Sequence, residues 1–176
     1  MPFILALLGV LSVAAVWYWR VKMAREAGGE LLDAAADVRA AVRRFGYRRR
    51  ADVHPADAVE DSRLAAAGVM AAVAGVDGAL SRAEIDAIAA EARRVFGAGP
   101  AEADEIAAFG RWVAGQCGTP EEAVRRLTRA IRRLAGDAAG PDLVAMAERV
   151  ARADGALPNE RQDELLHALR RGFERR

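Results

Sequence analysis

The sequence predicts an all-α protein, in which a single N-terminal transmembrane helix precedes a compact bundle of about six or seven helices with an internal duplication. The chain has 176 residues, of which 53% are hydrophobic but only 6% are aromatic. Good helix formers are abundant and runs of β-branched residues are scarce. Because few large side chains are present, the core is expected to consist of helices that pack closely.

The duplication lies within the predicted bundle. The segment V-A-G-V-D-G-A-L-S-R-A-E-I-D, Val73–Asp86, recurs as V-A-R-A-D-G-A-L-P-N-E-R-Q-D, Val150–Asp163. The offset of 77 positions pairs Asp77 with Asp154 and also pairs the glycines that follow them. Since one offset holds across two helices and a turn, two copies of a helix–turn–helix unit are expected within one domain.

The first 25 residues predict a membrane anchor. Pro2–Trp19 carries no charge, and as a helix it would span about 27 Å, close to the thickness of a bilayer core. The run ends on W-Y-W, which suits an interfacial aromatic belt, and basic residues follow at Arg20, Lys22 and Arg25. A cleaved signal peptide is the alternative, but its basic residues usually precede the apolar run. The positive-inside rule predicts a single-pass inner-membrane protein whose domain faces the cytoplasm.

Residues 26–60 are expected to form an amphipathic helix and a basic linker. Apolar residues recur at alternating spacings of four and three, at Leu31, Ala35, Val38, Val42 and Phe45. This stripe either packs on the main domain or pairs with a second copy of the chain as a short stalk. A homodimer is therefore one of the two alternatives. The triplet at 48–50 is either a contact for anionic lipid or a solvated linker.

The helical domain is expected at 61–176. Its first helix runs from about Ser62 to Val76 and ends at a turn whose glycine, Gly78, tolerates a positive φ. Ser81 and Glu84 have the spacing of a capping box that begins the second helix. The expected buried face of that helix consists of Ile85, Ile88, Ala92, Val95 and Phe96.

Proline marks the start of each later helix. Pro100 precedes a helix from about Ala101 to Gly115, and T-P-E-E at 119–122 combines a cap, a first-turn proline and a capping glutamate. Pro141 and Pro158 are expected to open the last two helices. The expected core positions of the helix after T-P-E-E are Val124, Leu127, Ile131 and Leu134.

The opposite face of that helix carries five arginines, Arg125, Arg126, Arg129, Arg132 and Arg133. They form either a solvated face with salt bridges to Glu121 and Glu122 or a binding surface for an acidic partner, lipid or nucleic acid. No aromatic side chains interleave for base stacking, and the net charge is only +1. Nucleic acid is therefore not an expected partner.

The repeated turns have the spacing D-G-x-L, which resembles the back half of an EF-hand loop. The positions for the first two oxygen ligands hold Val73 and Gly75, so an EF-hand calcium site is not expected. A divalent cation between the two copies is a separate hypothesis, with Asp77, Glu84, Asp154 and Glu160 as ligands. Oxygen-only ligands favour calcium, magnesium or manganese over zinc. Otherwise the aspartates are turn residues and Glu84 is a helix cap.

No constellation of residues indicates an enzyme. The sequence has no H-E-x-x-H motif, no phosphate-binding glycine loop and no G-x-S-x-G. Cys117 is the one cysteine and lies in Q-C-G-T, which matches no nucleophile motif. Catalysis is therefore not expected.

The repeated V-D-G or A-D-G, followed by a short link and a glutamate in an alanine-rich helical domain, resembles the TerB family, named for tellurite resistance. The resemblance covers about Asp61 to Arg176. It implies an all-helical, duplicated domain and, as in some members, a divalent metal bound through acidic residues near the turns. The corresponding residues here are Asp77, Glu84, Asp154 and Glu160. The second copy departs from the first, because Arg161 takes the position equivalent to Glu84.

An anchor before such a domain also resembles the DjlA-type membrane co-chaperones, which add a C-terminal J-domain. No J-domain is found in this sequence, so co-chaperone activity is not inferred. The expected function is a membrane-anchored TerB-like interaction module with a protein partner, at the cytoplasmic membrane face, in stress or envelope homeostasis. The alternative is a divalent-metal-binding sensor or sequestering protein related to tellurite resistance.

Overall fold

The computed structural model describes residues 36–48 and 52–174 of the chain. The chain divides into a unit of residues 1–36 and a unit of residues 37–176, and the description below concerns the second unit. The described residues contain helices and the turns between them, so the all-α prediction is confirmed for this part. None of the helices described there is long and apolar enough to cross a membrane. The anchor predicted at 1–25 lies outside the described residues.

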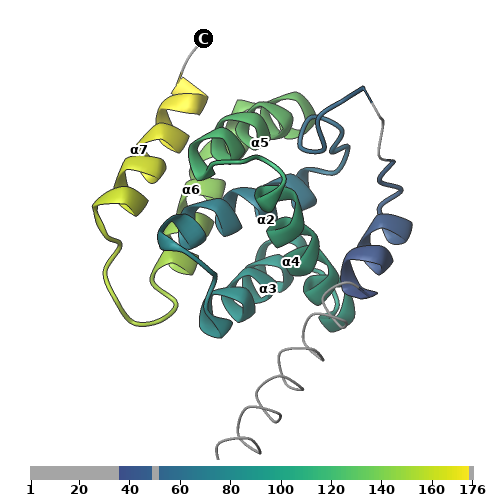
Figure 1. Ribbon diagram of the computed structural model, residues 1–176, viewed down its shortest axis with the longest axis horizontal. Helices are drawn as coiled ribbons and strands as arrows, with labels where there is room; N and C mark the ends of the chain where they lie inside the picture. The colour runs from purple at the N-terminus through teal and green to yellow at the C-terminus, as the bar shows by residue number, and fades with distance from the viewer. Residues whose placement is uncertain (1–35, 49–51, 175–176) are drawn as a thin grey trace, which may run out of the picture. The chain divides into compact units, whose positions relative to one another are not determined.

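From residue 62 to residue 174, six α-helices and two short 3₁₀ helices follow one another (Figure 1). A further helical segment occupies 36–44. In chain order the elements are α2 (Ser62–Ala74), η1 (Gly75–Asp77), α3 (Arg82–Phe96), α4 (Pro100–Gly115), α5 (Pro120–Ala135), η2 (Asp137–Ala139), α6 (Gly140–Ala151) and α7 (Glu160–Glu174).

Helix α2 is the centre of the fold, and α3, α4, α5 and α6 pack around it (Figure 1). Every residue of α2 after Arg63 is buried. Such a helix must have small side chains where its neighbours cross. A Cβ atom on Gly68 would lie 2.6 Å from a methyl group of Leu127 and 2.8 Å from a methyl group of Val113. The close packing expected from the alanine-rich composition is therefore present.

Local cap signals determine where the helices begin. The capping box of α3 is confirmed, with Ser81 Oγ accepting from the Glu84 N–H at 3.2 Å and Glu84 Oε2 accepting from the Ser81 N–H at 2.7 Å. The last helix begins at Glu160, two residues after the predicted start at Pro158. The reason is a second reciprocal cap between Asn159 and Gln162, each accepting a hydrogen bond from the other's backbone N–H.

Two residues expected in the core are exposed instead. Val95 is 36% exposed and Leu134 is 38% exposed. Both lie in the last turn of a helix, α3 and α5 respectively, where the neighbouring helices cover less of the surface. Periodicity identified the correct helix face but could not show how far along that face the packing extends.

The segment before α2 contributes to the same core. Ala41, Tyr47, Ala56 and Val59 are buried there. The ring of Tyr47 packs edge-on against two aromatic rings of α4, with centroid distances of 5.1 Å to Phe109 and 5.5 Å to Trp112.

The amphipathic stripe predicted upstream of α2 packs on the domain where it is described. Val42 and Phe45 are partly buried against the core, and Arg44 Nε donates to Glu105 Oε2 of α4 at 2.5 Å. The first two residues of the stripe lie outside the described residues. The described part of the stripe therefore packs on the domain, which was one of the two interpretations. The homodimer stays a prediction.

Candidate functional site

Asp77, the first predicted metal ligand, joins the two copies of the repeat. It lies at the end of η1 with its side chain exposed. Its carboxylate accepts a hydrogen bond from the Asn159 side-chain amide, and its Oδ1 lies 3.8 Å from a guanidinium nitrogen of Arg161. The first turn therefore contacts the start of α7, and the carboxylate already has two partners.

Glu84, the second predicted ligand, is a buried helix cap. Its carboxylate is committed to the backbone N–H of Ser81. This position in the first turn of α3 also places the negative charge at the positive end of the helix dipole. In this geometry Glu84 is a helix cap, which was the alternative to its predicted role as a metal ligand.

The remaining two predicted ligands lie on the surface of the second copy. Asp154 Oδ1 accepts from the Ala156 N–H at 3.1 Å and so closes its own turn, and Glu160 is the exposed first residue of α7. Within the described ranges, no three or more acidic, histidine or cysteine side chains gather closely enough to hold a metal ion. In the described conformation the four predicted residues therefore do not form a donor set for a divalent cation.

Gln162 is the structural counterpart of Glu84 in the second copy. The offset of 77 positions pairs Glu84 with Arg161 instead, so it did not identify Gln162. It follows Asp154 by eight residues, whereas Glu84 follows Asp77 by seven. Besides capping α7, its side-chain amide donates to the Ala74 carbonyl at the end of α2, at 3.3 Å. The sequence signal was the N-x-x-Q spacing, which is a capping pattern like S-x-x-E.

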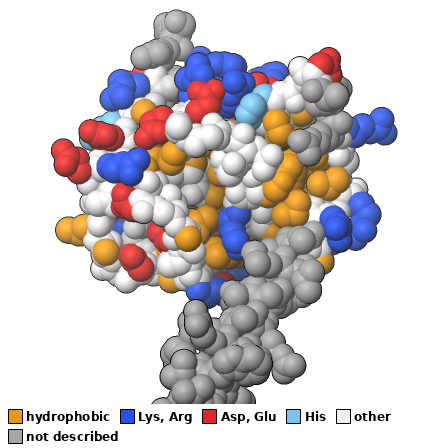
Figure 2. Space-filling model, in the orientation of Figure 1, with side chains coloured by type: hydrophobic (Ala, Val, Ile, Leu, Met, Phe, Trp, Pro, Cys, Tyr) orange, Lys and Arg blue, Asp and Glu red, His pale blue; other side chains and the backbone are white. Residues whose placement is uncertain are grey.

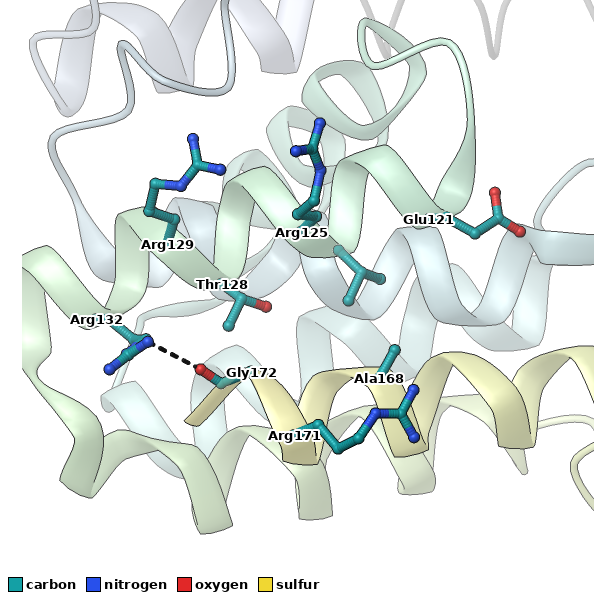
Figure 3. Close-up of a pocket in the computed structure, with 9 residues that line it drawn as sticks. Glu121, Arg125, Thr128, Arg129, Arg132, Ala168, Arg171 and Gly172 are labelled. Carbon is teal, nitrogen blue, oxygen red and sulfur yellow. Dashed lines mark hydrogen bonds between the residues drawn. The ribbon is translucent and has the colours of Figure 1, made fainter. Parts of the chain in front are cut away.

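A second candidate site is a groove of about 370 Å³ between α5 and α7. Figure 3 shows α5 along one side and α7 along the other. The lining side chains that carry charge are Glu121, Arg125, Arg129, Arg132 and Arg171. Figure 2 shows both basic and acidic side chains on the visible face of the molecule, as the low net charge predicts.

The structure divides the arginine-rich face of α5 into two groups. Arg126 pairs with Asp57 and Glu122, and Arg133 donates to the Val59 carbonyl at 3.0 Å. These two arginines hold the segment before α2 against α5. The other three, Arg125, Arg129 and Arg132, line the groove.

Only some of the arginines in the groove are neutralised. Arg125 donates to Glu122 at 3.0 Å. Arg132 donates to Asp137 at 2.6 Å, and this hydrogen bond raises the pKa of Arg132 and lowers that of Asp137. Within the part of the chain that is described, Arg129 and Arg171 have neither an ion pair nor a side-chain hydrogen bond. Arg171, on α7, was not among the candidates from the sequence.

Thr128 lies between the two helices and lines the groove. It is 5% exposed, and its hydroxyl group has no hydrogen-bond partner among the described residues. Figure 3 shows the hydroxyl on the groove side of α5. Buried hydroxyl groups are normally paired, often with the carbonyl one turn earlier in the helix, so an unpaired one indicates a missing partner.

Cys117 does not have the surroundings of a reactive thiol. It is buried after α4, and its thiol donates to the Val113 carbonyl at 3.4 Å. Burial raises the pKa of Cys117, which favours the neutral thiol over the nucleophilic thiolate.

The family model described as tellurite resistance protein TerB matches residues 63–170, more than half of the chain. The chain belongs to the TerB family. No curated protein and no solved structure matches the chain. The match confirms the resemblance found in the sequence, and the predicted anchor lies outside the matched residues.

The TerB match extends from α2 into α7, so it includes both copies of the repeat. The four predicted metal ligands and Thr128 and Arg129 of the groove all lie within the matched residues, while Arg171 follows directly after them. The four predicted ligands and most of the groove therefore lie within the matched TerB domain.

Proposed function

We propose that this TerB-family chain is an interaction module held at the cytoplasmic face of the inner membrane, where it acts in stress or envelope homeostasis. Two features of the sequence support the location: the uncharged run Pro2–Trp19 and the basic residues that follow it. The interaction itself is supported by one observation on the TerB domain, the exposure of Leu157.

Leu157 lies in the loop between α6 and α7 and is 82% exposed. Its counterpart in the first copy, Leu80, is partly buried, and its Cγ would lie 3.4 Å from a Cβ atom on Gly75. The second copy has Arg152 in place of that glycine, and Leu157 is not covered as Leu80 is. Burying a leucine side chain contributes about 1.5–3 kcal/mol, which a protein partner with an apolar pocket would gain.

The proposal predicts that a photo-crosslinking residue at position 157 of the full-length chain captures a discrete protein partner in isolated membranes. The matched control is the same residue at position 79, because Ala79 is exposed in the corresponding turn of the first copy. The full-length chain is expected to stay in the membrane pellet after a carbonate wash. A chain that lacks residues 1–25 is expected to move to the soluble fraction.

The two parts of the proposal fail separately. Recovery of the full-length chain in the soluble fraction, or its cleavage after the apolar run, contradicts the anchor. Equal crosslinking from positions 157 and 79, or none from either, contradicts a partner at Leu157.

The second candidate function is binding of a divalent cation, favoured by the contact between Asp77 and Asn159. Through this contact the Asp77 carboxylate of the first copy lies against Asn159, the residue that directly precedes Glu160 in the second copy. For a cation to bind, Asp77 would have to exchange its contacts with Asn159 and Arg161 for the metal. The Arg161 contact is exposed and long, at 3.8 Å, so it opposes this exchange weakly.

If this candidate is correct, millimolar calcium, magnesium or manganese raises the melting temperature of the detergent-solubilised chain. A hundredfold excess over the dissociation constant adds about 2.7 kcal/mol, or roughly 5–10 °C for a domain of this size. Asp77→Asn and Asp154→Asn are each expected to reduce the shift, while Asp104→Asn, on an exposed face of α4, leaves it unchanged. Absence of a shift with all three cations would eliminate this candidate.

A further inference from the structure

We propose that the groove between α5 and α7 binds the phosphate group of a phosphomonoester, carried by a soluble metabolite or by a lipid headgroup. This inference goes beyond the proposed function, because it depends on neither the anchor nor Leu157. It is carried by the unbalanced charge of the groove together with the unpaired hydroxyl of Thr128.

The groove has an excess of positive charge, because Arg125 and Arg132 are paired with Glu122 and Asp137 but Arg129 and Arg171 are not paired. Four arginines line it against a single carboxylate, and that carboxylate, Glu121, lies 3.8 Å from a guanidinium nitrogen of Arg161. Arg129 and Arg171 have no partner in the described residues, and they come from the two opposite walls. An anion held between these walls would supply the counter-charge that both arginines lack. Guanidinium groups bind phosphate oxygens in a bidentate manner.

Thr128 supplies the second, independent indication of a ligand. The buried hydroxyl group has no hydrogen-bond partner among the described residues, and a phosphate oxygen would accept its hydrogen bond. The same side chain sits closely against α7, since a Cβ atom on Gly172 would lie 2.9 Å from Thr128 Cγ2. The glycine therefore allows α7 to approach α5 at the point where the hydroxyl lies.

The width of the groove is held by a contact between the two helices. Arg132 donates from a guanidinium nitrogen to the Gly172 carbonyl at 3.1 Å, as the dashed line in Figure 3 shows. The volume of about 370 Å³ exceeds that of a phosphate ion, so the alcohol portion of a small phosphomonoester also has room. No aromatic side chain lines the groove, which disfavours the base stacking that single-stranded nucleic acid requires.

Binding requires two arginines to move. In Figure 3 the side chains of Arg125 and Arg129 point away from α7, while Arg171 extends along α7. Both α5 arginines are exposed, and binding would rotate their side chains over the groove. Arg125 would exchange its contact with Glu122 for the ligand, whereas Arg129 has no contact to give up.

The test is calorimetric titration of the full-length chain in an uncharged detergent. In the soluble arm the probe is glycerol 3-phosphate, and in the lipid arm it is phosphatidic acid in mixed micelles, with phosphatidylcholine as the comparison. The paired variant Arg129→Gln/Arg171→Gln is expected to weaken phosphate binding at least about tenfold, because each arginine contributes charge-assisted hydrogen bonds. Thr128→Val, which keeps the side-chain shape, is also expected to weaken it about tenfold.

The matched control removes the same charge from elsewhere. Arg93→Gln/Arg152→Gln alters two exposed arginines whose side chains form no hydrogen bond or ion pair in the described residues, and it is expected to change the affinity less than about twofold. Binding in either arm with this pattern of variants supports the proposal, and the tighter arm identifies the source of the phosphate. Three results would overturn it: no binding of either probe, equal losses in the two paired variants, or unchanged binding in a folded Thr128→Val chain.

Discussion

Gly110→Ala is expected to lower the free energy of unfolding by about 2–3 kcal/mol, although alanine is the better helix former. Gly110 lies where α4 crosses α2, and a Cβ atom there would be 2.6 Å from the carbonyl carbon of Ala67 and 2.7 Å from its Cβ. Backbone atoms of a buried helix cannot rotate away as a side chain can. The two helices would have to separate, which would loosen the core around α2.

Urea unfolding followed by circular dichroism measures this effect, with Gly115→Ala as the matched control. Gly115 ends the same helix, and a Cβ atom there would meet nothing within 4 Å. The control is expected to be neutral or to stabilise by up to about 1 kcal/mol. Equal effects of the two substitutions would show that α2 and α4 are not in this close contact.

Glu91→Ala is the second large effect expected, with a loss of about 2 kcal/mol. Glu91 is 6% exposed, and both of its carboxylate oxygens accept hydrogen bonds from Arg149 of α6 at 2.8 Å. Arg94 donates to the same carboxylate at 2.6 Å. The substitution disconnects α3 from α6 and leaves two guanidinium groups without a partner. Since both arginines are about half exposed, the loss falls below the 3–5 kcal/mol typical of fully buried pairs.

The contribution of Glu91 is expected to depend on pH. Burial by itself would raise the pKa of Glu91, but the hydrogen bonds from Arg149 and Arg94 outweigh it and hold the pKa below its usual value of 4.5. A carboxyl group with a lowered pKa stabilises the fold above its unfolded pKa, and the contribution is lost as the pH falls through the folded pKa. The stability difference between the wild type and Glu91→Gln is therefore expected to be full above about pH 5 and to shrink below about pH 4.

Thermal melts of the wild type and Glu91→Gln between pH 3 and pH 7 measure this difference. Glu164→Gln, an exposed carboxyl group on α7 without a contact in the described residues, serves as the control and should show a small difference at every pH. A difference for Glu91→Gln that stays constant or grows on acidification would contradict the ion-pair role.

The sequence by itself determined the helical class, the element order and the family. These depend on short-range signals: the Ser81–Glu84 box, the proline that opens each of α4 and α5, and the D-G turns. Gly78 and Gly155 do adopt positive φ angles, of 152° and 85°. Such signals act within one helical turn, so they can be read without knowing the neighbours. The start of α7 was misplaced because proline at 158 is a weaker signal than the reciprocal cap of Asn159 and Gln162.

Only the tertiary structure decided what the charged residues do. The arginine face of α5 has a uniform pattern in sequence, yet Arg133 binds a carbonyl of the segment before α2 while Arg129 borders a groove formed with α7. Asp77 and Asp154 are equivalent in the repeat, but only Asp77 contacts the start of α7. The physical reason is that periodicity assigns a residue to a helix face, whereas its partner is set by the helix that packs opposite.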